Sequence, residues 1–222
     1  ISHGWTLDGE GRKMSKSLGN TIDPVSVCNE SGADIFRLWA ATQDFKADMR
    51  IGDSNLKQVS EQYRKIRNTF RFLLGNLNPE DFDLKKDLLP YTELENVDRH
   101  MMCQLNTVNK AAKEAYNKYD FIQATSVMTN FMTNELSSYY LDWTKDILYI
   151  DKVDAKRRRQ VQTVLFHAVD TLVKLWSPIL CYTSEEVWAS LKSDEALSVH
   201  YTHFNPTYEY EDETALNETF AL

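Results

Sequence analysis

An apolar repeat with spacings of three and four residues returns in four long segments of the sequence, and it constrains the fold more than any other feature. Such spacing places apolar side chains along one face of an α-helix. The segments cover residues 56–77, 94–116, 121–143 and 161–176. Because each of these helices must bury one face, the sequence predicts a mainly α protein, built as an antiparallel helical bundle around one apolar core.

Capping residues predict where several helices begin. Asp23-Pro24 combines an N-cap aspartate with proline at the first helical position, and Asp120 precedes the third long segment. Ser31-Gly32-Ala33-Asp34 and Thr183-Ser184-Glu185-Glu186 both match the capping-box pattern, in which a hydroxyl and an acid three residues later satisfy free backbone N–H groups. We therefore expect a helix to start at each of these four places.

A compact cationic segment, Lys13-Met14-Ser15-Lys16-Ser17, precedes the helices. Glycines at positions 9, 11 and 19 permit sharp backbone turns on both sides of it. Asp8-Gly9 is a hairpin-turn signal, so we expect two short strands within residues 1–13. The segment suits a polyphosphate, because its ammonium groups supply charge and its hydroxyl and N–H groups supply hydrogen bonds. By composition alone it is also typical of a solvated surface turn.

The overall charge is acidic, but one helix carries a local basic stripe. The net charge of −8 argues against indiscriminate nucleic-acid binding, which requires an overall basic field. Within the first long helix, Lys57, Arg64 and Arg71 lie seven residues apart, and Arg67 joins the same side. We call these four residues the basic ridge. It is a candidate for contact with nucleic-acid phosphates, and a structural role against acids elsewhere in the bundle is the alternative.

A second and denser basic run lies at the start of the fourth long helix. It ends in four successive cations: Lys156, Arg157, Arg158 and Arg159. Cations at a helix N-terminus oppose the helix dipole, so another interaction must favour them. Bound phosphate is one explanation, and solvated charge beside Asp151 and Asp154 is the other.

Other polar and aromatic residues also have two interpretations. Arg37 contacts RNA or forms a surface ion pair. The aromatic residues Tyr139, Tyr140 and Trp143 follow one another closely near a predicted helix junction. They stack on unpaired nucleic-acid bases if they are exposed, and they pack against the bundle if they are half-buried.

The sequence offers no pattern for a metal centre or a membrane segment. Cys28, Cys103 and Cys181 are far apart and form no Cys-x-x-Cys pair, and no histidine shows metal-ligand spacing. No apolar run approaches the length of a membrane span, and no secretory leader is present. We therefore expect a cytoplasmic protein with no metal site in this segment and no membrane partner.

The cationic segment also carries a family resemblance. Lys-Met-Ser-Lys-Ser is the signature loop of class I aminoacyl-tRNA synthetases, and its flanks Leu-Asp-Gly-Glu-Gly-Arg and Leu-Gly-Asn resemble those of bacterial isoleucyl enzymes. The stretches at 33–39, 63–77 and 177–188 resemble the connecting segment and anticodon-domain helices of the same enzymes. The resemblance spans nearly the whole chain, and valyl or leucyl enzymes of the same subclass are the closest alternatives.

The resemblance implies two parts and a set of functional residues. Residues 1–52 correspond to the end of the catalytic domain with a short β and loop remnant, and residues 53–222 correspond to a helical anticodon-binding domain. The implied ATP-binding residues are Lys13, Met14, Ser15, Lys16 and Ser17, with Lys16 and Lys13 as catalytic cations. The implied tRNA contacts are Lys57, Arg64, Arg67, Arg71, Lys156, Arg157 and Arg158.

The resemblance also implies a larger parent enzyme. That enzyme would use ATP with Mg²⁺ to activate isoleucine and would transfer it to isoleucine tRNA, and we expect it to be cytoplasmic and monomeric. The His-Ile-Gly-His-type motif, the amino-acid pocket, the editing domain and a zinc module would lie outside this sequence, so we expect the isolated chain to be inactive. A non-catalytic helical interaction module that keeps the loop as a relic is the more distant alternative.

Overall fold

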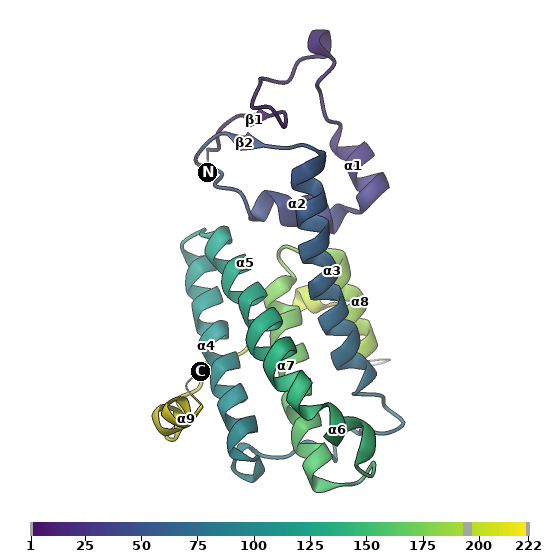
Figure 1. Cartoon of the computed structure of the whole chain (residues 1–222), viewed down its shortest axis with the longest axis vertical. Helices are drawn as coiled ribbons and strands as arrows, with labels where there is room; N and C mark the ends of the chain where they lie inside the picture. The colour runs from purple at the N-terminus through teal and green to yellow at the C-terminus, as the bar shows by residue number, and fades with distance from the viewer. Residues whose placement is uncertain (1, 193–196, 221–222) are drawn as a thin grey trace.

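The computed structural model describes residues 2–192 and 197–220, and it consists of helices, loops and one two-stranded sheet (Figure 1). Within this part of the chain, each helix is too short or too polar to span a membrane. In chain order the elements are β1 (Thr6–Leu7), the 3₁₀ turn η1 (Lys16–Leu18), α1 (Pro24–Ser31), α2 (Ala33–Ala41), β2 (Met49–Arg50), α3 (Asp53–Gly75), η2 (Tyr91–Glu93), α4 (Asn96–Asn117), α5 (Phe121–Asn130), the π-helix η3 (Phe131–Leu141), α6 (Asp142–Ile150), α7 (Lys156–Trp176), α8 (Cys181–Lys192), η5 (Val199–Tyr201) and α9 (Glu213–Thr219).

The predicted helical bundle is confirmed. Figure 1 shows α3, α4, α5, α6, α7 and α8 stacked below a smaller N-terminal part that contains β1, β2, α1 and α2. The apolar stripe of α3 is buried at Val59, Ile66, Phe70 and Leu73. Helix α7 is the central element of the core, since it contacts α3, α4, α6 and α8 and ends in the fully buried Trp176. Burial of one such side chain stabilises the fold by about 1.5–3 kcal/mol.

The predicted N-terminal hairpin forms only in part: its turn is present, but no second strand follows it. β1 pairs in parallel with β2, with Thr6 opposite Met49. The turn after β1 is closed by an antiparallel bridge between Leu7 and Lys13 and by a hydrogen bond from the N–H of Asp8 to the carbonyl oxygen of Arg12. The carboxylate of Asp8 accepts hydrogen bonds from the N–H groups of Glu10 and Arg12, so the turn is organised by a side chain instead of a second strand. The segment between the two strands returns through α1 and α2.

A helix begins at or near each of the four predicted places, α1 at Pro24, α2 at Ala33, α5 at Phe121 and α8 at Cys181, but only two of the predicted caps are confirmed. Asp23 accepts hydrogen bonds from the first-turn N–H groups of α1, and Asp120 accepts one from Gln123 at the start of α5. Both capping boxes are wrong. Ser31 is the last residue of α1, and Thr183 lies inside α8. Asp34 and Thr183 bind each other instead of capping their own helices. The carboxylate of Asp34 accepts hydrogen bonds from the N–H and hydroxyl groups of Thr183, 2.7 and 2.6 Å away.

The third long segment forms one nearly continuous helical path whose middle is a π-helix. α5 passes directly into η3, and η3 passes directly into α6. The i to i+5 bonds of a π-helix widen the coil, which is uncommon over more than one turn and is frequent at functional sites. Polar groups line the outer side of η3, and its buried side is formed by Phe131, Met132, Leu136 and Tyr140.

After α8 and η5 the chain runs along the bundle before it forms α9. We call residues 203–210 the strap. Phe204 of the strap stacks on Tyr116 of α4, and α9 also packs against α4, where its Leu216 is buried. The strap therefore covers the outer edge of the α4–α7 pair.

Candidate functional site

The signature loop projects from the end of the molecule that is opposite the turn between α6 and α7 (Figure 1). The hydroxyl of Ser15 caps the 3₁₀ turn η1 by accepting from the N–H of Leu18, and it lies 3.2 Å from the hydroxyl of Ser17. Gly19 ends the turn at φ +65°, a conformation that side chains disfavour. The short turn therefore displays Lys16 and Ser17 on an exposed, preformed curve.

A buried carboxylate beneath the loop holds its two ends together. Asp8 is only 6% exposed, and its Oδ2 accepts from the Asn20 amide and the Arg12 guanidinium, each 2.9 Å away. Asn20 in turn accepts from the N–H of Ser15 at 2.9 Å. These hydrogen bonds, chiefly that from Asn20, hold the pKa of Asp8 well below its usual range. No helix or strand pattern in the sequence marks this clamp, so it was not predicted.

The two loop lysines are both solvent-exposed. The Nζ atom of Lys13 lies 4.7 Å from the centre of the Trp5 ring, an exposed cation–π contact worth about 0.5–1 kcal/mol. Neither Lys13 nor Lys16 forms an ion pair with any residue in the described ranges. Met14 packs its side chain partly against the core. The loop thus presents two cations that no carboxylate of the described chain neutralises.

The basic ridge is exposed along α3. Lys57, Arg64, Arg67 and Arg71 all have exposed side chains. Arg64 pairs with Glu61 on the same helix, at a surface where such a pair contributes little. For Lys57, Arg67 and Arg71, no ion pair is present within the described residues. Among the described residues, these three cations therefore do not pair with acids of the bundle, as the structural alternative would require.

The basic run at the start of α7 has a different arrangement. Arg158 contacts Asp81 and the carbonyl oxygen of Asp151, and Arg159 contacts Asp87 and the carbonyl oxygen of Asp81. The side chains of Arg158 and Arg159 are only 14% and 13% exposed. The alternative of solvated charge does not describe them, since both side chains are largely buried and pair with Asp81 and Asp87 of the loop between α3 and α4.

Arg157 is engaged most deeply. Its guanidinium binds both oxygens of Asp98, which has no solvent exposure and also accepts from the hydroxyl of Tyr140 at 2.6 Å. Burial raises the pKa of Tyr140 well above its ordinary value, so this hydroxyl stays protonated and donates. Lys156 pairs with Glu93 at 3.1 Å and remains largely exposed. The predicted tRNA contacts at Lys156, Arg157 and Arg158 are untested, and the structure gives each of them a partner within the chain.

A polar groove of about 800 Å³ lies between α3 and η3. Most of its lining residues are polar, and Phe72, Leu141 and the aliphatic parts of the polar side chains add apolar surface. The polar residues are Gln58, Glu61, Gln62, Lys65, Asn68, Thr69, Thr129, Thr133, Asn134, Ser137, Ser138 and Lys145. Some are already paired, since the hydroxyl of Thr69 lies 3.1 Å from that of Ser137. In the part of the chain that the structure describes, the amides of Asn68 and Asn134 make no hydrogen bond. The sequence analysis missed this groove, because it depends on a π-helix that the repeat does not reveal.

The aromatic residues divide between the core and the surface. Tyr140 is fully buried and Tyr139 is partly buried, as the packing interpretation predicted. Trp143 is 53% exposed with the Arg157 guanidinium 5.6 Å from its ring centre, and Tyr149 of α6 is 66% exposed. Tyr149 lies beside Arg71 in a second hollow that shares Asn68 and Phe72 with the polar groove. The exposed ring of Tyr149 is therefore available next to the groove.

A buried joint connects the loop-bearing part to the bundle. The guanidinium of Arg37 donates to the carbonyl oxygens of Pro178 and Ile179, each 2.8 Å away, at the corner between α7 and α8. Asp34 binds Thr183 in the next turn, and the hydroxyl of Thr183 lies 2.8 Å from that of Tyr63. The ion-pair interpretation of Arg37 is thus wrong, because its partners among the described residues are carbonyl oxygens and not an acid, and the RNA contact stays a prediction. The joint fixes α2, and with it the preceding loop segment, on the bundle.

The described residues contain no cluster of three or more histidine, cysteine, aspartate or glutamate side chains placed to hold a metal ion. The three cysteines are free thiols.

Two protein-family models match this chain. Residues 98–222 match the anticodon-binding domain of tRNA ligase, and residues 1–52 match the class I tRNA synthetases for isoleucine, leucine, methionine and valine. Among curated proteins, the isoleucine–tRNA ligase of Geobacillus thermodenitrificans (strain NG80-2) is 50% identical over 218 residues, which is 97% of this chain and 23% of that protein. The isoleucine–tRNA ligase of Listeria monocytogenes (serovar 1/2a) is 52% identical over 200 residues, 90% of this chain and 22% of that protein. The chain thus spans about a quarter of the length of these relatives.

Solved structures agree at the level of fold. The ternary complex of Agrobacterium radiobacter K84 agnB2 LeuRS with tRNA and LeuAMS matches with a TM-score of 0.69 at 22% identity, over 92% of this chain and 23% of that one. The methionyl-tRNA synthetase of Mycobacterium tuberculosis with methionyl-adenylate matches with a TM-score of 0.67 at 14% identity, over 90% of this chain and 43% of that one. The family resemblance drawn from the signature loop is confirmed.

Proposed function

Since this chain belongs to the anticodon-binding domain family of tRNA ligases, we propose that its bundle binds the anticodon arm of a tRNA and that its loop serves an ATP site completed outside residues 1–222. The observation that carries the proposal is the exposed basic ridge of α3, three of whose cations have no ion-pair partner among the described residues. Free cations spaced along one side of a helix can each neutralise a backbone phosphate.

The groove beside the ridge supplies the second part of the proposed interface. Phosphate contacts position a nucleic acid, while base edges carry the sequence information. Unpaired RNA bases are recognised by hydrogen bonds to their edges and by stacking on aromatic side chains. The free amides of Asn68 and Asn134 offer both donors and acceptors, and Tyr149 offers an exposed ring. We infer that the ridge aligns the anticodon arm and that these groups contact its bases.

The loop lysines suit the first half-reaction of aminoacylation. In that step, an amino-acid carboxylate attacks the α-phosphorus of ATP and pyrophosphate leaves, so negative charge grows on the phosphates. Mg²⁺ bound with ATP would neutralise part of this charge. We assign the remaining stabilisation to Lys16, with Lys13 as a second phosphate contact and with Met14, Ser15 and Ser17 completing the loop. The Asp8–Asn20 clamp would keep the loop in its curved form.

The complete protein is proposed to be an isoleucine–tRNA ligase of the cytoplasm that acts on isoleucine tRNA as a monomer. Half-identical relatives of that name over nearly the whole chain support this choice over a valyl or leucyl enzyme. We place the boundary between the catalytic part and the anticodon-binding part at residues 52 and 53, where the class I synthetase match ends and α3 begins. This chain alone is proposed to be inactive, because it contains only the end of the catalytic part.

The test compares binding of this chain to isoleucine tRNA and to the same tRNA with a changed anticodon across a salt series. We expect tighter binding to the native anticodon and a linear decrease of log K with log salt concentration. Asn134→Ala should reduce the difference between the two tRNAs, whereas Lys110→Ala, an exposed cation on α4, should change neither affinity. Equal, salt-insensitive affinity for both tRNAs would contradict the proposal and favour a non-catalytic interaction module.

The loop is tested separately in the full-length protein. Lys16→Ala should lower the rate of ATP–pyrophosphate exchange by about 100-fold or more, as loss of a transition-state cation does elsewhere. Binding of tRNA should not change, because Lys16 lies in the N-terminal part and not on the bundle. An unchanged exchange rate would contradict the assignment to Lys16 without affecting the proposal for the bundle.

A further inference from the structure

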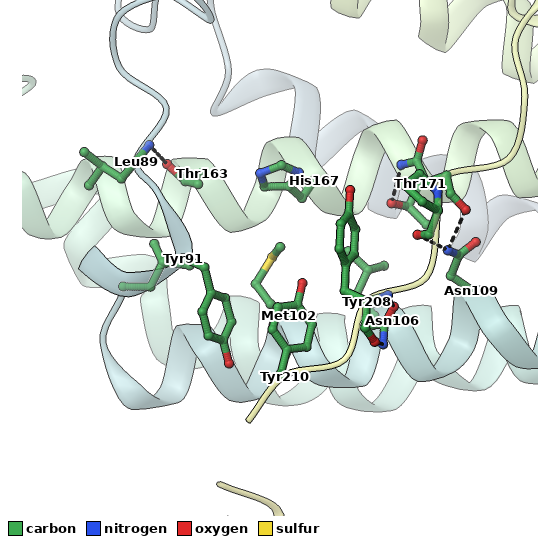
Figure 2. Close-up of a pocket in the computed structure, with 14 residues that line it drawn as sticks. Leu89, Tyr91, Met102, Asn106, Asn109, Thr163, His167, Thr171, Tyr208 and Tyr210 are labelled. Atoms are coloured by element: carbon green, nitrogen blue, oxygen red, sulfur yellow. Dashed lines mark hydrogen bonds between the residues drawn. The ribbon is translucent and has the colours of Figure 1, made fainter. Parts of the chain in front are cut away.

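A cavity of about 260 Å³ lies between α4, α7 and the strap, away from the signature loop and the basic ridge (Figure 2). No residue of the proposed tRNA interface lines it. Its walls come from four separated parts of the chain: the segment around η2, α4, α7 and the strap. The tRNA proposal therefore does not account for this cavity.

The strap is tied to α4 by side-chain amides. Asn106 donates to the carbonyl oxygen of Tyr208 and accepts from its N–H group, both at 2.8 Å. The Nδ2 of Asn109 donates to the carbonyl oxygens of Asn205 and Pro206 at 3.1 Å. Amide side chains thus replace strand pairing and fix the strap at both ends of the cavity.

The strap is also tied to α7, through the side chain of Asn205. Its Oδ1 accepts from the ammonium of Lys174 at 2.7 Å, and its Nδ2 donates to Asp170 and Thr171 at 2.8 and 2.9 Å. Because the strap is anchored to both helices, it holds the wall of the cavity in place. The space is therefore preformed, as small-molecule sites usually are.

The lining surface is mainly apolar and aromatic, and most of its amide groups are paired; the exception among the described residues is the buried Oδ1 of Asn109, an acceptor with no hydrogen-bond partner. Figure 2 shows the rings of Tyr91, Tyr208 and Tyr210, the imidazole of His167 and the thioether of Met102 around the space. The hydroxyl of the lining residue Thr163 already donates to a main-chain carbonyl of α7 and accepts from a main-chain N–H of the loop before η2. No lysine, arginine, aspartate or glutamate belongs to the lining. A charged ligand would therefore lose its hydration without gaining an oppositely charged partner.

The tyrosines form a series of neighbouring rings that a flat ligand would extend. Tyr91 and Tyr210 are stacked with ring centres 4.3 Å apart, and the Tyr208 ring lies 6.1 Å from that of Tyr210. Tyr208 is 56% exposed and stands at the mouth, while Leu94 and Leu105 are buried at the floor. Ring faces and a methionine sulfur both favour aromatic partners.

We propose that this cavity is a binding site for a neutral, flat aromatic molecule of one or two fused rings, and that the ligand inserts beside Tyr208 and Met102. The volume matches on the order of ten non-hydrogen atoms. The proposal is independent of the tRNA function, and it predicts that binding tightens the attachment of the strap.

The test uses the whole chain, labelled at the methionine methyl groups, and titrates it with indole. The Met102 methyl resonance should shift and saturate at about 1 mM, the range that ligand efficiency permits for so small a molecule. Indole-3-acetate, which is similar in shape but charged, should bind at least tenfold more weakly. Met102→Trp should fill the space and abolish the binding, whereas Tyr201→Ala, an exposed residue outside the cavity, should leave it unchanged.

Three results would overturn the proposal. The first is an unshifted Met102 resonance up to about 10 mM indole. The second is equal affinity for indole-3-acetate. The third is wild-type affinity in a folded Met102→Trp protein, with folding checked by circular dichroism. If that variant does not fold, Tyr208→Ala replaces it, because Tyr208 is largely exposed and its loss should not disturb the core. At least fivefold weaker indole binding by Tyr208→Ala would support the site. Unchanged indole affinity would overturn the proposal.

Discussion

The basic ridge of α3 and the basic run of α7 look alike in the sequence and differ completely in the structure. In the ridge, Lys57, Arg67 and Arg71 are exposed and have no ion-pair partner among the described residues. In the run, the side chains of Arg157, Arg158 and Arg159 are 23%, 14% and 13% exposed, and each meets an acid from another part of the chain. Density of positive charge in the sequence therefore does not show whether a cation is free for an external partner, whereas its contacts within the fold do.

The difference has a physical cause. The run lies at the N-terminus of α7, where the helix dipole disfavours cations, so its arginines require compensation. Asp98 is the most effective partner, since it is fully buried and would be costly to bury unpaired. The ridge runs along an exposed side of α3, from its second turn to near its C-terminus, and solvent alone can stabilise its charges. The positive charges are thus stabilised by carboxylates in the run and by water in the ridge.

Arg157→Ala gives the largest expected effect and tests the structural role of the run. Removal of the guanidinium leaves the Asp98 carboxylate buried with only the Tyr140 hydroxyl as a partner, so the free energy of unfolding should fall by about 3–5 kcal/mol. Urea unfolding followed by circular dichroism measures it. Asp98→Asn combined with Arg157→Ala should recover part of the loss, because the unpaired charge is then removed. A loss below about 1 kcal/mol would show that the pair is not the buried structural contact described above.

Arg67→Ala with Arg71→Ala tests the other half of the comparison. If both cations contact phosphates, tRNA affinity should fall roughly 10- to 100-fold at 0.1 M salt, and the slope of log K against log salt should decrease by about 1.5. Stability should stay within about 0.5 kcal/mol of the original, because both side chains are exposed. Lys110→Ala is the matched control, since it removes an exposed positive charge from α4. If the control lowers affinity equally, the effect would come from net charge and not from the ridge.

The contrast also shows what the sequence could predict. The stripe that includes Ile66 and Phe70 in α3 depends on local spacing, which is why the helices and their buried faces were predicted correctly. The partner of Arg157 is 59 residues away in the sequence, and Asp34 binds Thr183 at a separation of 149 residues. Such contacts exist only after the helices have packed, so no local pattern distinguishes a paired arginine from a free one.

The same reason explains the other errors and omissions. Both capping boxes were wrong because Asp34 and Thr183 bind each other across the α2–α8 contact instead of capping their own helices. The polar groove was missed because η3 is a π-helix, whose wider coil moves its side chains away from the positions that a regular repeat predicts. The signature loop was found from its residues, but the Asp8 clamp beneath it required coordinates.

The signature loop carries a third set of cations, Lys13 and Lys16, in addition to the ridge and the run. Acid pH should act on this loop through Asp8. The Asn20 amide and the Arg12 N–H group lower the pKa of this carboxyl. A lowered pKa means that the clamp contributes its full stabilisation above about pH 4, the value of an unfolded aspartate, and loses it as the pH falls through the lower folded value. Hydrogen exchange at the N–H groups of Ser15 and Arg12, referenced to the α7 core, should show this loss. In Asp8→Asn the exchange should be faster at neutral pH and independent of pH in this range, once the intrinsic rate is subtracted. An unchanged pattern would mean that Asp8 does not organise the loop.

Lys156 gives the smallest expected effect and marks the boundary between the two clusters. It belongs to the basic run by position, yet its side chain is 66% exposed and its partner Glu93 is 48% exposed. A pair so close to water contributes about 0–1 kcal/mol and weakens with salt, so Lys156→Ala should change stability very little. The tRNA affinity of the Lys156→Ala variant then distinguishes two possibilities. If affinity falls and the salt slope decreases by about 0.7–0.9, Lys156 exchanges Glu93 for a phosphate, and an exposed internal pair does not exclude a cation from the interface. If neither changes, a single carboxylate partner at the surface is enough to remove a cation from it, and the proposed interface is confined to α3 and the groove beside it.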